Sequence, residues 1–226
     1  MNERPESEAA EGQSRPMRDL AYRNFTDRLM SRDIRPGQFV SQRELVAMTG
    51  MPLGAIRELV PRLEADGLIK TVPKRGMQVA HIDLDLIRNA FQFRLMMERE
   101  AVAEFARTAP DDLIADQLRQ HLEIAAEAKN GVSPTLLQQA QTMDWHLHDL
   151  MIDRLGNEII SNAYRINSIK IRLISFERVR MLPELVVSVM TEHLPILEAA
   201  ARRDVAGAVT AMEAHIASAR ARALAM

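Results

Sequence analysis

The chain has 226 residues, a net charge of −2 and no cysteine, which excludes disulfides and thiolate metal sites and is compatible with a reducing compartment. Its polar N-terminus lacks the apolar core of a secretory signal, and no run of roughly 18 apolar residues could span a membrane. We therefore expect a soluble, cytoplasmic protein with no membrane partner, long enough for one large domain or two modest ones.

Charge is distributed unevenly along the chain. Residues 17–80 hold eleven Lys and Arg against seven Asp and Glu, a balance of +4. Residues 81–226 hold sixteen against twenty, a balance of −4, and residues 1–16 supply the remaining −2. A basic segment followed by an acidic one is typical of a DNA-binding domain joined to a domain with another task.

The first elements are a tail and a helix. Residues 1–16 are polar and charged, and we interpret them as a disordered tail. Residues 18–31 show helical periodicity, which predicts a helix with an apolar stripe formed by Leu20, Phe25, Leu29 and Met30. The turn at residues 34–37 leads from this helix into the next element.

Two short helices are predicted next. Ser41 followed by Glu44 is a capping box, which opens a helix over residues 42–48. After a tight turn, Pro52 suits the first position of a second helix, because its fixed φ and missing N–H cost nothing there. Gly67 is the glycine at which this second helix should stop.

A β-hairpin follows the two helices. Residues 68–72 and 77–80 are β-rich, and the loop between them, residues 73–76, has the sequence Pro-Lys-Arg-Gly. Helix, turn, helix and a ribbon with a basic tip predict a winged helix-turn-helix domain, which we assign to residues 17–82. The second helix of this fold suits the major groove of double-stranded DNA, and the wing tip suits its backbone or minor groove.

Motifs in this stretch resemble the DNA-binding domain of GntR-family bacterial transcription regulators. The matching runs are Ile34-Arg35-Pro36-Gly37, Gln42-Arg43-Glu44-Leu45, Gly50, Ile56-Arg57-Glu58, Leu63-Glu64-Ala65-Asp66-Gly67-Leu68 and Arg75-Gly76. The resemblance implies that DNA contacts come from Arg43 on the first short helix, Arg57 on the recognition helix, and Arg75 and Gly76 in the wing.

The start of the recognition helix departs from the family pattern. Pro52, Leu53 and Gly54 stand where the family usually has Ser or Thr, then Arg, then Thr. One expected contact to a base or phosphate is therefore missing, and we expect an unusual operator sequence. Leu53 and Gly54 remain candidate DNA-binding residues at this position, and Lys74 at the wing tip completes the candidate set.

Beyond residue 82 the chain is predicted to be helical throughout. Pro, Gly and N-cap residues divide it into six segments, at 86–107, 111–130, 134–155, 157–181, 183–203 and 204 to the C-terminus. Antiparallel helices with short loops predict a six- to seven-helix bundle over residues 83–226. The predicted fold class is therefore mainly α, with an N-terminal winged helix-turn-helix and a C-terminal antiparallel bundle.

Histidines and an aspartate recur in this bundle. Asp144 and His148 are separated by four residues, so they share one helix face. His193 and His215 lie on the fifth and sixth predicted helices, and a bundle can direct all four side chains inward. Three imidazoles and a carboxylate suit Zn, Ni, Mn or Fe rather than Ca or Mg. On spacing alone, core or surface histidines without a metal are the more common interpretation.

A second resemblance favours the metal. Asp144-x-x-x-His148, Asn157 nine residues later, Glu192-His193 and Met212-x-x-His215 resemble the effector-binding (FCD) domain of FadR-type GntR regulators. The resemblance implies that Asp144, His148, His193 and His215 bind a divalent metal, with Zn the first choice. It also implies that a small organic acid, a carboxylate effector, occupies the open coordination sites of that metal.

Arg94 and Trp145 each allow two interpretations. Arg94 stands in the place of an arginine that family members direct toward an effector carboxylate. The alternative is an ion pair with Glu98, four residues on, along a solvated helix face. Trp145 is the only tryptophan, and its position beside Asp144 fits either the core, which we favour, or the wall of a pocket.

Three functions fit this sequence. The first, which we expect, is a transcription regulator, a repressor, that binds a palindromic operator as a homodimer and responds to a small effector. The second is a metal-dependent enzyme in which the metal polarises a substrate or activates water, with Glu192 as the only candidate base. The third is a metal sensor, in which the metal itself is the signal. We expect no catalytic residue.

Overall fold

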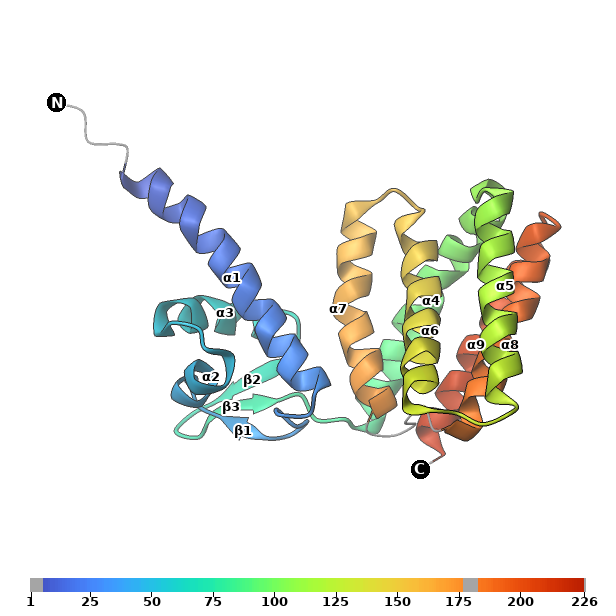
Figure 1. Cartoon of the computed structure of the whole chain (residues 1–226). Coiled ribbons are helices and arrows are strands. Elements are labelled where there is room, and N and C mark those ends of the chain that lie inside the picture. The colour runs from blue at the N-terminus through green and yellow to red at the C-terminus, as the bar shows by residue number, and fades with distance from the viewer. Residues whose placement is uncertain (1–5, 177–182, 226) are drawn as a thin grey trace. The chain divides into compact units, whose positions relative to one another are not determined.

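The computed structural model describes residues 6–176 and 183–225, with side chains from residue 17 onward. The chain divides into two compact units, Met1–Ile82 and Asp83–Met226. In Figure 1 the first unit combines helices with a small sheet, whereas the second is drawn with helices only. The predicted fold class, mainly α with a winged helix-turn-helix and a helical bundle, is confirmed.

The first unit is a winged helix-turn-helix with a core of its own. Its elements are α1 (Glu6–Met30), β1 (Phe39–Val40), α2 (Gln42–Thr49), α3 (Leu53–Ala65), β2 (Ile69–Val72) and β3 (Gly76–Val79). The fully buried large side chains come from the helices and the segments between them, and include Phe25, Leu29, Ile34, Leu45, Ile56, Leu59, Leu63 and Leu68. Each such side chain favours folding by about 1.5–3 kcal/mol.

Local signals fix the ends of the two short helices. The Ser41 hydroxyl accepts the Glu44 N–H, and the Glu44 carboxylate accepts the Ser41 N–H at 2.7 Å, so the predicted capping box is formed. At the end of α3, the N–H of Leu68 donates to the carbonyl of Leu63, and Gly67 has a φ of +67°. This left-handed residue ends the helix as the sequence predicted.

The first helix begins earlier than the sequence predicted. It starts at Glu6, whereas we expected disorder over residues 1–16 and a helix from Arg18. Ala, Glu and Gln dominate the first residues of α1, and their high intrinsic helix propensity extends the helix upstream. The first five residues of the expected tail lie outside the described residues.

The apolar stripe of α1 also differs from the prediction. Ala21, Phe25 and Leu29, spaced four residues apart, are buried, whereas Leu20 is 38% exposed. The sequence pattern placed Leu20 on the buried face because Leu is more apolar than its neighbour Ala21. The smaller side chain is the one that fits against α2 and α3, which both pack on α1.

Proline 61 lies inside α3 instead of ending it. Its missing N–H predicts a kink or an end at Val60, but the helix continues to Ala65. Leu59 and Leu63 are fully buried on either side and hold the helix against the core. Pro61 itself is exposed, so water can replace the hydrogen bond that the ring removes.

The sheet of the first unit has the order β1-β3-β2, and both pairings are antiparallel. The hairpin of β2 and β3 was predicted, and Ile69 pairs with Val79 in its register. The pairing of β1 with β3, in which Phe39 faces Gln78, was not predicted. A strand of two residues is too short to show the alternation by which strands are recognised.

The second unit is a helical bundle. Its helices are α4 (Leu84–Thr108), α5 (Asp111–Ala128), α6 (Pro134–Asp153), α7 (Glu158–Ile174), α8 (Pro183–Ala201) and α9 (Val205–Leu224). Four of these helices, α4, α6, α7 and α9, begin at a capping side chain that accepts a hydrogen bond from a backbone N–H of the first turn. The capping residues are Asp83, Ser133, Asn157 and Asp204. The last part of the predicted fourth helix, residues 177–181, lies outside the described residues.

Helices distant in sequence pack together in this bundle. Helix α4 lies along α9, and α5 lies along α8, as Figure 1 also shows. Small and large apolar side chains fill the space between α5, α6 and α8, among them Ala125, Leu136, Ala140, Val186 and Met190. The bundle therefore brings residues of α4, α6, α8 and α9 close together in its interior.

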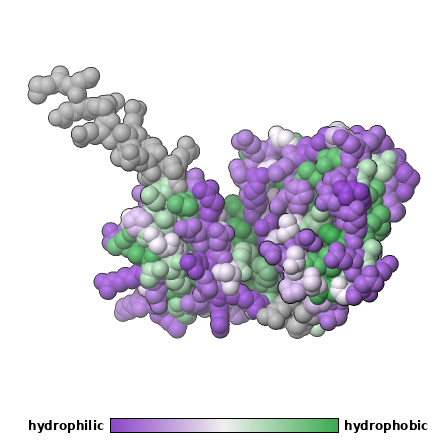
Figure 2. Space-filling model, viewed as in Figure 1, coloured by the Kyte–Doolittle hydropathy of each residue, from purple (hydrophilic) through white to green (hydrophobic). Residues whose placement is uncertain are grey.

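The described helices include none that is both long and apolar enough to cross a membrane. In Figure 2 hydrophilic residues cover much of the visible surface of each unit, with hydrophobic patches between them on the bundle. Several large apolar side chains of the bundle are exposed: Leu84 by 61%, Met96 by 67% and Ile159 by 81%.

Candidate metal centre and nucleic-acid interface

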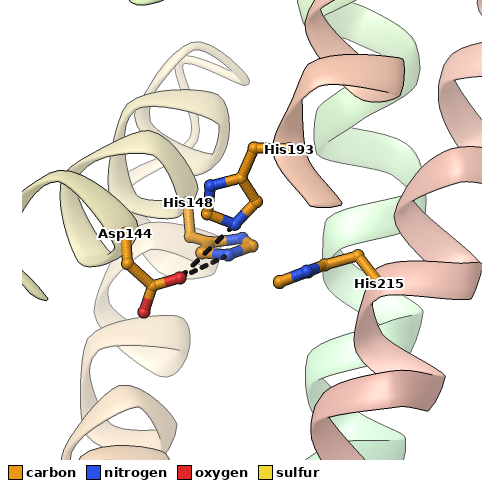
Figure 3. Close-up of side chains that lie close together, drawn as sticks. All are labelled: Asp144, His148, His193 and His215. Atoms are coloured by element: carbon orange, nitrogen blue, oxygen red, sulfur yellow. Dashed lines mark ion pairs between the residues drawn. The ribbon is translucent and has the colours of Figure 1, made fainter. Parts of the chain in front are cut away.

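Four predicted ligands meet inside the bundle. Asp144 and His148 come from α6, His193 from α8 and His215 from α9, and Figure 3 shows their side chains converging. One potential ligand atom from each residue can be chosen so that all four lie within 4.8 Å of one another. Nε2 of His193 lies 3.4 Å from Oδ1 of Asp144, and Nε2 of His148 lies 3.8 Å from the same oxygen.

The three imidazoles are buried, and one nitrogen of each has no partner. His148, His193 and His215 are exposed by 3% or less. Their Nε2 atoms accept or donate no hydrogen bond among the described residues. An unpaired buried polar atom costs stability, and three of them facing one point are unusual in a native core. A cation at that point would satisfy all three, so the residues present fit a metal.

A carboxylate lies on the other side of two of these rings. Nδ1 of His148 is 2.8 Å from Oε2 of Glu98, and Nδ1 of His215 is 3.1 Å from Oε2 of Glu192. The contact of His215 is a hydrogen bond, and a carboxylate can only accept, so the neutral ring of His215 carries its proton on Nδ1 and its lone pair on Nε2. The contact of His148 with Glu98 is an ion-pair contact. Carboxylates behind ligand histidines are the usual device for orienting them toward a metal.

His193 is oriented by another histidine. Nδ1 of His121, on α5, lies 2.7 Å from the carbonyl oxygen of Gln117 and must donate to it. Nε2 of His121 is therefore an acceptor, and it lies 3.1 Å from Nδ1 of His193. His193 donates through Nδ1, which leaves its Nε2 lone pair for the centre. His193 and His215 thus each keep an Nε2 lone pair free for a metal.

Burial disfavours the charged form of His193, His215 and His121. Burial lowers the pKa of His215 to about 3 and also lowers the pKa of His193. Burial, with His193 beside it, lowers the pKa of His121 to about 4. Burial alone would raise the pKa of Asp144, but the nearby His193 and His148 hold it below its usual value. Near neutral pH, His193 and His215 therefore offer neutral nitrogens, and Asp144 offers a carboxylate.

Sequence reasoning missed the orienting residues. Glu98 and His121 lie on helices α4 and α5, and no spacing relates them to the ligands that they contact. Glu192 was predicted as the candidate base of an enzyme. In the structure it accepts two hydrogen bonds from Arg222, at 2.6 and 3.0 Å, as well as facing His215. This geometry makes Glu192 an orienting residue.

A cavity of about 70 Å³ adjoins the centre. Asp144 and His215 form part of its wall, so the two spaces are continuous. Six of the ten other wall residues are apolar: Phe91, Trp145, Phe176, Leu185, Val189 and Ala219. The four polar ones are Arg94, Gln141, Ser175 and Arg222. Trp145 therefore lines the cavity, and the favoured prediction that it is a core residue is wrong. Its ring packs edge-on against Phe176.

Arg94 forms the predicted ion pair and also lines the cavity, whereas its role toward an effector stays a prediction. Its Nε donates to Oε1 of Glu98 at 2.7 Å, which is the predicted ion pair. The pair is buried, however, with Glu98 fully enclosed, instead of lying on a solvated face. Arg94 also lines the cavity beside Asp144. Burial would raise the pKa of Glu98, but Arg94 and His148 hold it below its usual value. Glu98 therefore joins Arg94 to a candidate ligand.

The candidate DNA-binding residues lie on the surface of the first unit. Arg43 is exposed on α2, and Leu53, Gly54 and Arg57 are exposed on α3. Pro52 is the N-cap of α3 and offers no side-chain cap. A Cβ built on Gly54 would meet nothing within 4 Å, so this glycine is not required by packing. One face of α3 is thus free for a partner.

The wing has a defined turn. The N–H of Arg75 donates to the carbonyl of Val72, with Pro73 and then Lys74 at the corner. Lys74 has a φ of +64°, which makes this a type II turn and leaves the lysine exposed at the tip.

Two wing residues also have structural roles. A Cβ on Gly76 would lie 2.9 Å from the carbonyl oxygen of Val40, so glycine allows β1 to approach. The guanidinium of Arg75 lies 4.2 Å from the centre of the Phe39 ring. Both residues therefore help to join the wing to β1.

Comparisons with known proteins find relatives among transcription regulators. Residues 89–218 match the FCD domain family. The repressor RspR of Escherichia coli K12 is 27% identical over 90% of this chain and 87% of its own length. The uncharacterised regulator YdhC of Bacillus subtilis is 21% identical, over 62% of each chain.

A solved structure supports the fold. A putative GntR regulator from Rhodococcus sp. RHA1 is 19% identical, covers 95% of this chain and 98% of its own, and superposes with a TM-score of 0.72. The match includes the winged unit as well as the bundle. The FCD match covers more than half of the chain, so this protein belongs to the GntR family of transcription regulators, in the FadR-type subgroup whose effector domain is an FCD domain.

Proposed function

We propose that this regulator is a DNA-binding repressor whose operator affinity is controlled by a small carboxylate effector bound next to a divalent metal. The observation that supports it most is the grouping of Asp144 with three buried histidines, whose Nε2 atoms make no hydrogen bond, beside a cavity lined by Arg94. RspR, a relative over most of the chain, is named as a repressor.

The donor set suits zinc best. His148, His193, His215 and Asp144 would hold it, and Ni, Mn or Fe fits the same donors. When bound, the metal supplies a positive charge with open positions for an oxygen ligand. Glu98, His121 and Glu192 hold the imidazoles in the orientation that this requires.

A chelator experiment separates this proposal from a metal sensor. Operator binding by the metal-loaded protein is measured with and without a panel of small organic acids, and again after chelation. We expect an organic acid to weaken operator binding only while metal is present. If chelation alone gives the full change and no acid adds to it, the metal is the signal and the proposed effector control is wrong.

The bundle is proposed to form the homodimer. Phe93 and Met96, spaced three residues apart on α4, are 38% and 67% exposed, and large apolar groups that share an exposed helix face favour association. Two winged units related by two-fold symmetry would then read an inverted repeat, which doubles the few base contacts of one unit.

Replacing Met96 by Glu should convert the dimer to monomers, because a charge would enter an apolar interface. The measurement is light scattering at micromolar concentration. Leu122→Glu is the matched control, because Leu122 is an exposed leucine, by 52%, on α5. We expect this control to remain dimeric, and a parent protein that is monomeric would exclude the proposed assembly.

Arg57 should read a base edge from the exposed face of α3. Replacing it by Ala should weaken binding to the operator by about 1–3 kcal/mol and relax specificity at one position. Leu53, exposed by 40% at the first turn, suits contact with a thymine methyl group. The measurement is a titration of labelled operator and of random DNA, and equal losses on both would contradict base reading by Arg57.

Lys74 should contact the DNA backbone instead. Lys74 is exposed at the wing tip, where we propose that it contacts phosphates and no base. Lys74→Ala should weaken all DNA alike and reduce the slope of log affinity against log salt by about one. The Lys70→Ala variant, which removes an exposed lysine from β2, serves as its control. An unchanged salt slope for Lys74→Ala would remove it from the interface.

A further inference from the structure

We propose that the cavity beside the centre selects a short-chain monocarboxylate with an apolar tail, of about three to five carbons, and rejects dicarboxylates and longer or aromatic acids. This inference rests on the proposed function and specifies its effector. Three properties of the wall lead to it: its charge, the distribution of its apolar side chains and its size.

The charge of the wall favours one negative charge on the ligand. Arg222 is bound through two nitrogens to Glu192, and Arg94 is bound to buried Glu98. Each arginine is thus neutralised by its own carboxylate. Asp144 is the remaining charged residue among the described wall residues. With a divalent cation and neutral imidazoles, the sum is +1, which one carboxylate balances.

A second carboxylate would have no cation of its own among the described wall residues. Gln141 and Ser175 could offer it only neutral hydrogen bonds, and otherwise it would lie against apolar side chains or compete with Glu98 or Glu192 for an arginine. Burying an unpaired charge is costly, and taking an arginine away from its buried carboxylate leaves that carboxylate as an unpaired buried charge. The two internal ion pairs therefore select against dicarboxylates. Two arginines without these carboxylate partners would instead favour a dicarboxylate.

The position of the carboxylate follows from the wall. Among the described contacts Arg94 donates through Nε alone, so its outer N–H groups have no recorded acceptor. Arg94 and Asp144 both line the cavity. A carboxylate near the centre can accept from this guanidinium while Glu98 holds it in place, and charge-assisted hydrogen bonds of this kind are strong.

The rest of the wall suits a hydrocarbon tail. Trp145, Phe176, Leu185, Val189 and Ala219 offer carbon surface, and a tail placed against them leaves water. The cavity is partly open and has a volume of about 70 Å³, about half of a 150 Å³ engineered cavity that accommodates benzene. With the carboxylate at the centre, only a tail of a few carbons has to enter this space, so a short acid suits it better than an aromatic or a long-chain acid.

Trp145 makes the inference testable. It is the only tryptophan of the chain and it lines the cavity, so its fluorescence reports on this space. Zinc-loaded full-length protein is titrated with butyrate, and with butyramide, succinate and octanoate. We expect saturable binding of butyrate, and affinities at least tenfold weaker for the neutral amide, the dicarboxylate and the long acid. Succinate or butyramide binding as tightly as butyrate overturns the charge argument, and octanoate doing so overturns the size argument.

Two variants of α9 locate the binding. Ala219 lines the cavity, so Ala219→Leu fills it and should reduce butyrate affinity at least tenfold. Ala217, two residues earlier, is exposed on the same helix, and Ala217→Leu should bind butyrate as the parent does. Both variants should retain stoichiometric zinc by elemental analysis. Equal butyrate binding by Ala219→Leu and the parent overturns the cavity as the binding site.

The same measurements separate this inference from the proposed function. A protein that holds zinc but shows no change in Trp145 emission with millimolar butyrate excludes the monocarboxylate, and leaves metal-dependent regulation by another effector intact. A protein that holds no zinc refutes the proposed function, and with it the charge balance on which the monocarboxylate depends.

Discussion

Replacing His193 by Ala should abolish stoichiometric zinc binding and the thermal stabilisation that zinc confers. His193 is fully buried and supplies one of the four candidate ligand atoms, so its loss leaves an incomplete set of donors among the described residues. A ligand bound only by the folded state stabilises it by about 4 kcal/mol at a thousand times its dissociation constant. In a protein of this size that corresponds to roughly 8–16 °C in melting temperature.

The measurement is elemental analysis and a melting curve, each with and without chelator, for parent and variant. Chelator should lower the melting temperature of the parent and leave that of His193→Ala unchanged. His146→Ala is the matched control, because His146 lies on α6 between two ligands but is exposed. It should behave as the parent. Full zinc occupancy in His193→Ala would show that the centre is somewhere else.

Replacing Arg94 by Ala should cost about 3–5 kcal/mol of unfolding free energy even without metal, because it leaves Glu98 charged and unpaired in the interior. Glu98 also accepts the hydroxyl of Tyr164 at 2.7 Å and lies 2.8 Å from His148, so its position affects the centre as well. The measurement is urea unfolding of the metal-free protein, followed by helical circular dichroism.

Arg119 provides a matched control for this variant. It pairs with Glu123 at the same spacing of four residues, but more than half of each side chain is exposed. Exposed pairs contribute about 1 kcal/mol or less, so Arg119→Ala should have little effect. Replacing both Arg94 and Glu98 by Leu should recover part of the loss, since no buried charge is then left unpaired. Equal losses in Arg94→Ala and Arg119→Ala would contradict the account.

Local signals were sufficient to predict much of the fold. The capping box at Ser41, the glycine at position 67 and the Ser133-Pro134 start each act within a few residues, so they can be recognised in sequence. The start of the first helix was mispredicted because its residues allow two interpretations. A polar, charged tail has the composition typical of disordered segments, but Ala and Glu also have high helix propensity.

The candidate centre was predictable only in part. Asp144 and His148 share a helix face at a fixed spacing, and resemblance supplied His193 and His215. The orienting contacts of Glu98 and His121 could not be predicted, because they depend on which helices become neighbours in the bundle. For the same reason the spacing of Arg94 and Glu98 predicted their ion pair but not its burial, which decides its energetic importance.

The order of these elements along the chain affects how the protein is made. The winged unit is complete at Ile82, whereas the centre requires His215 on α9. At roughly 5–20 residues per second of translation, the ribosome finishes the first unit roughly 7 to 27 seconds before it supplies the last ligand. A truncated product that ends before α9 would keep the entire winged unit and lack one candidate ligand and Arg222. Premature termination or proteolysis in this region would therefore release fragments that carry the winged unit without a complete centre.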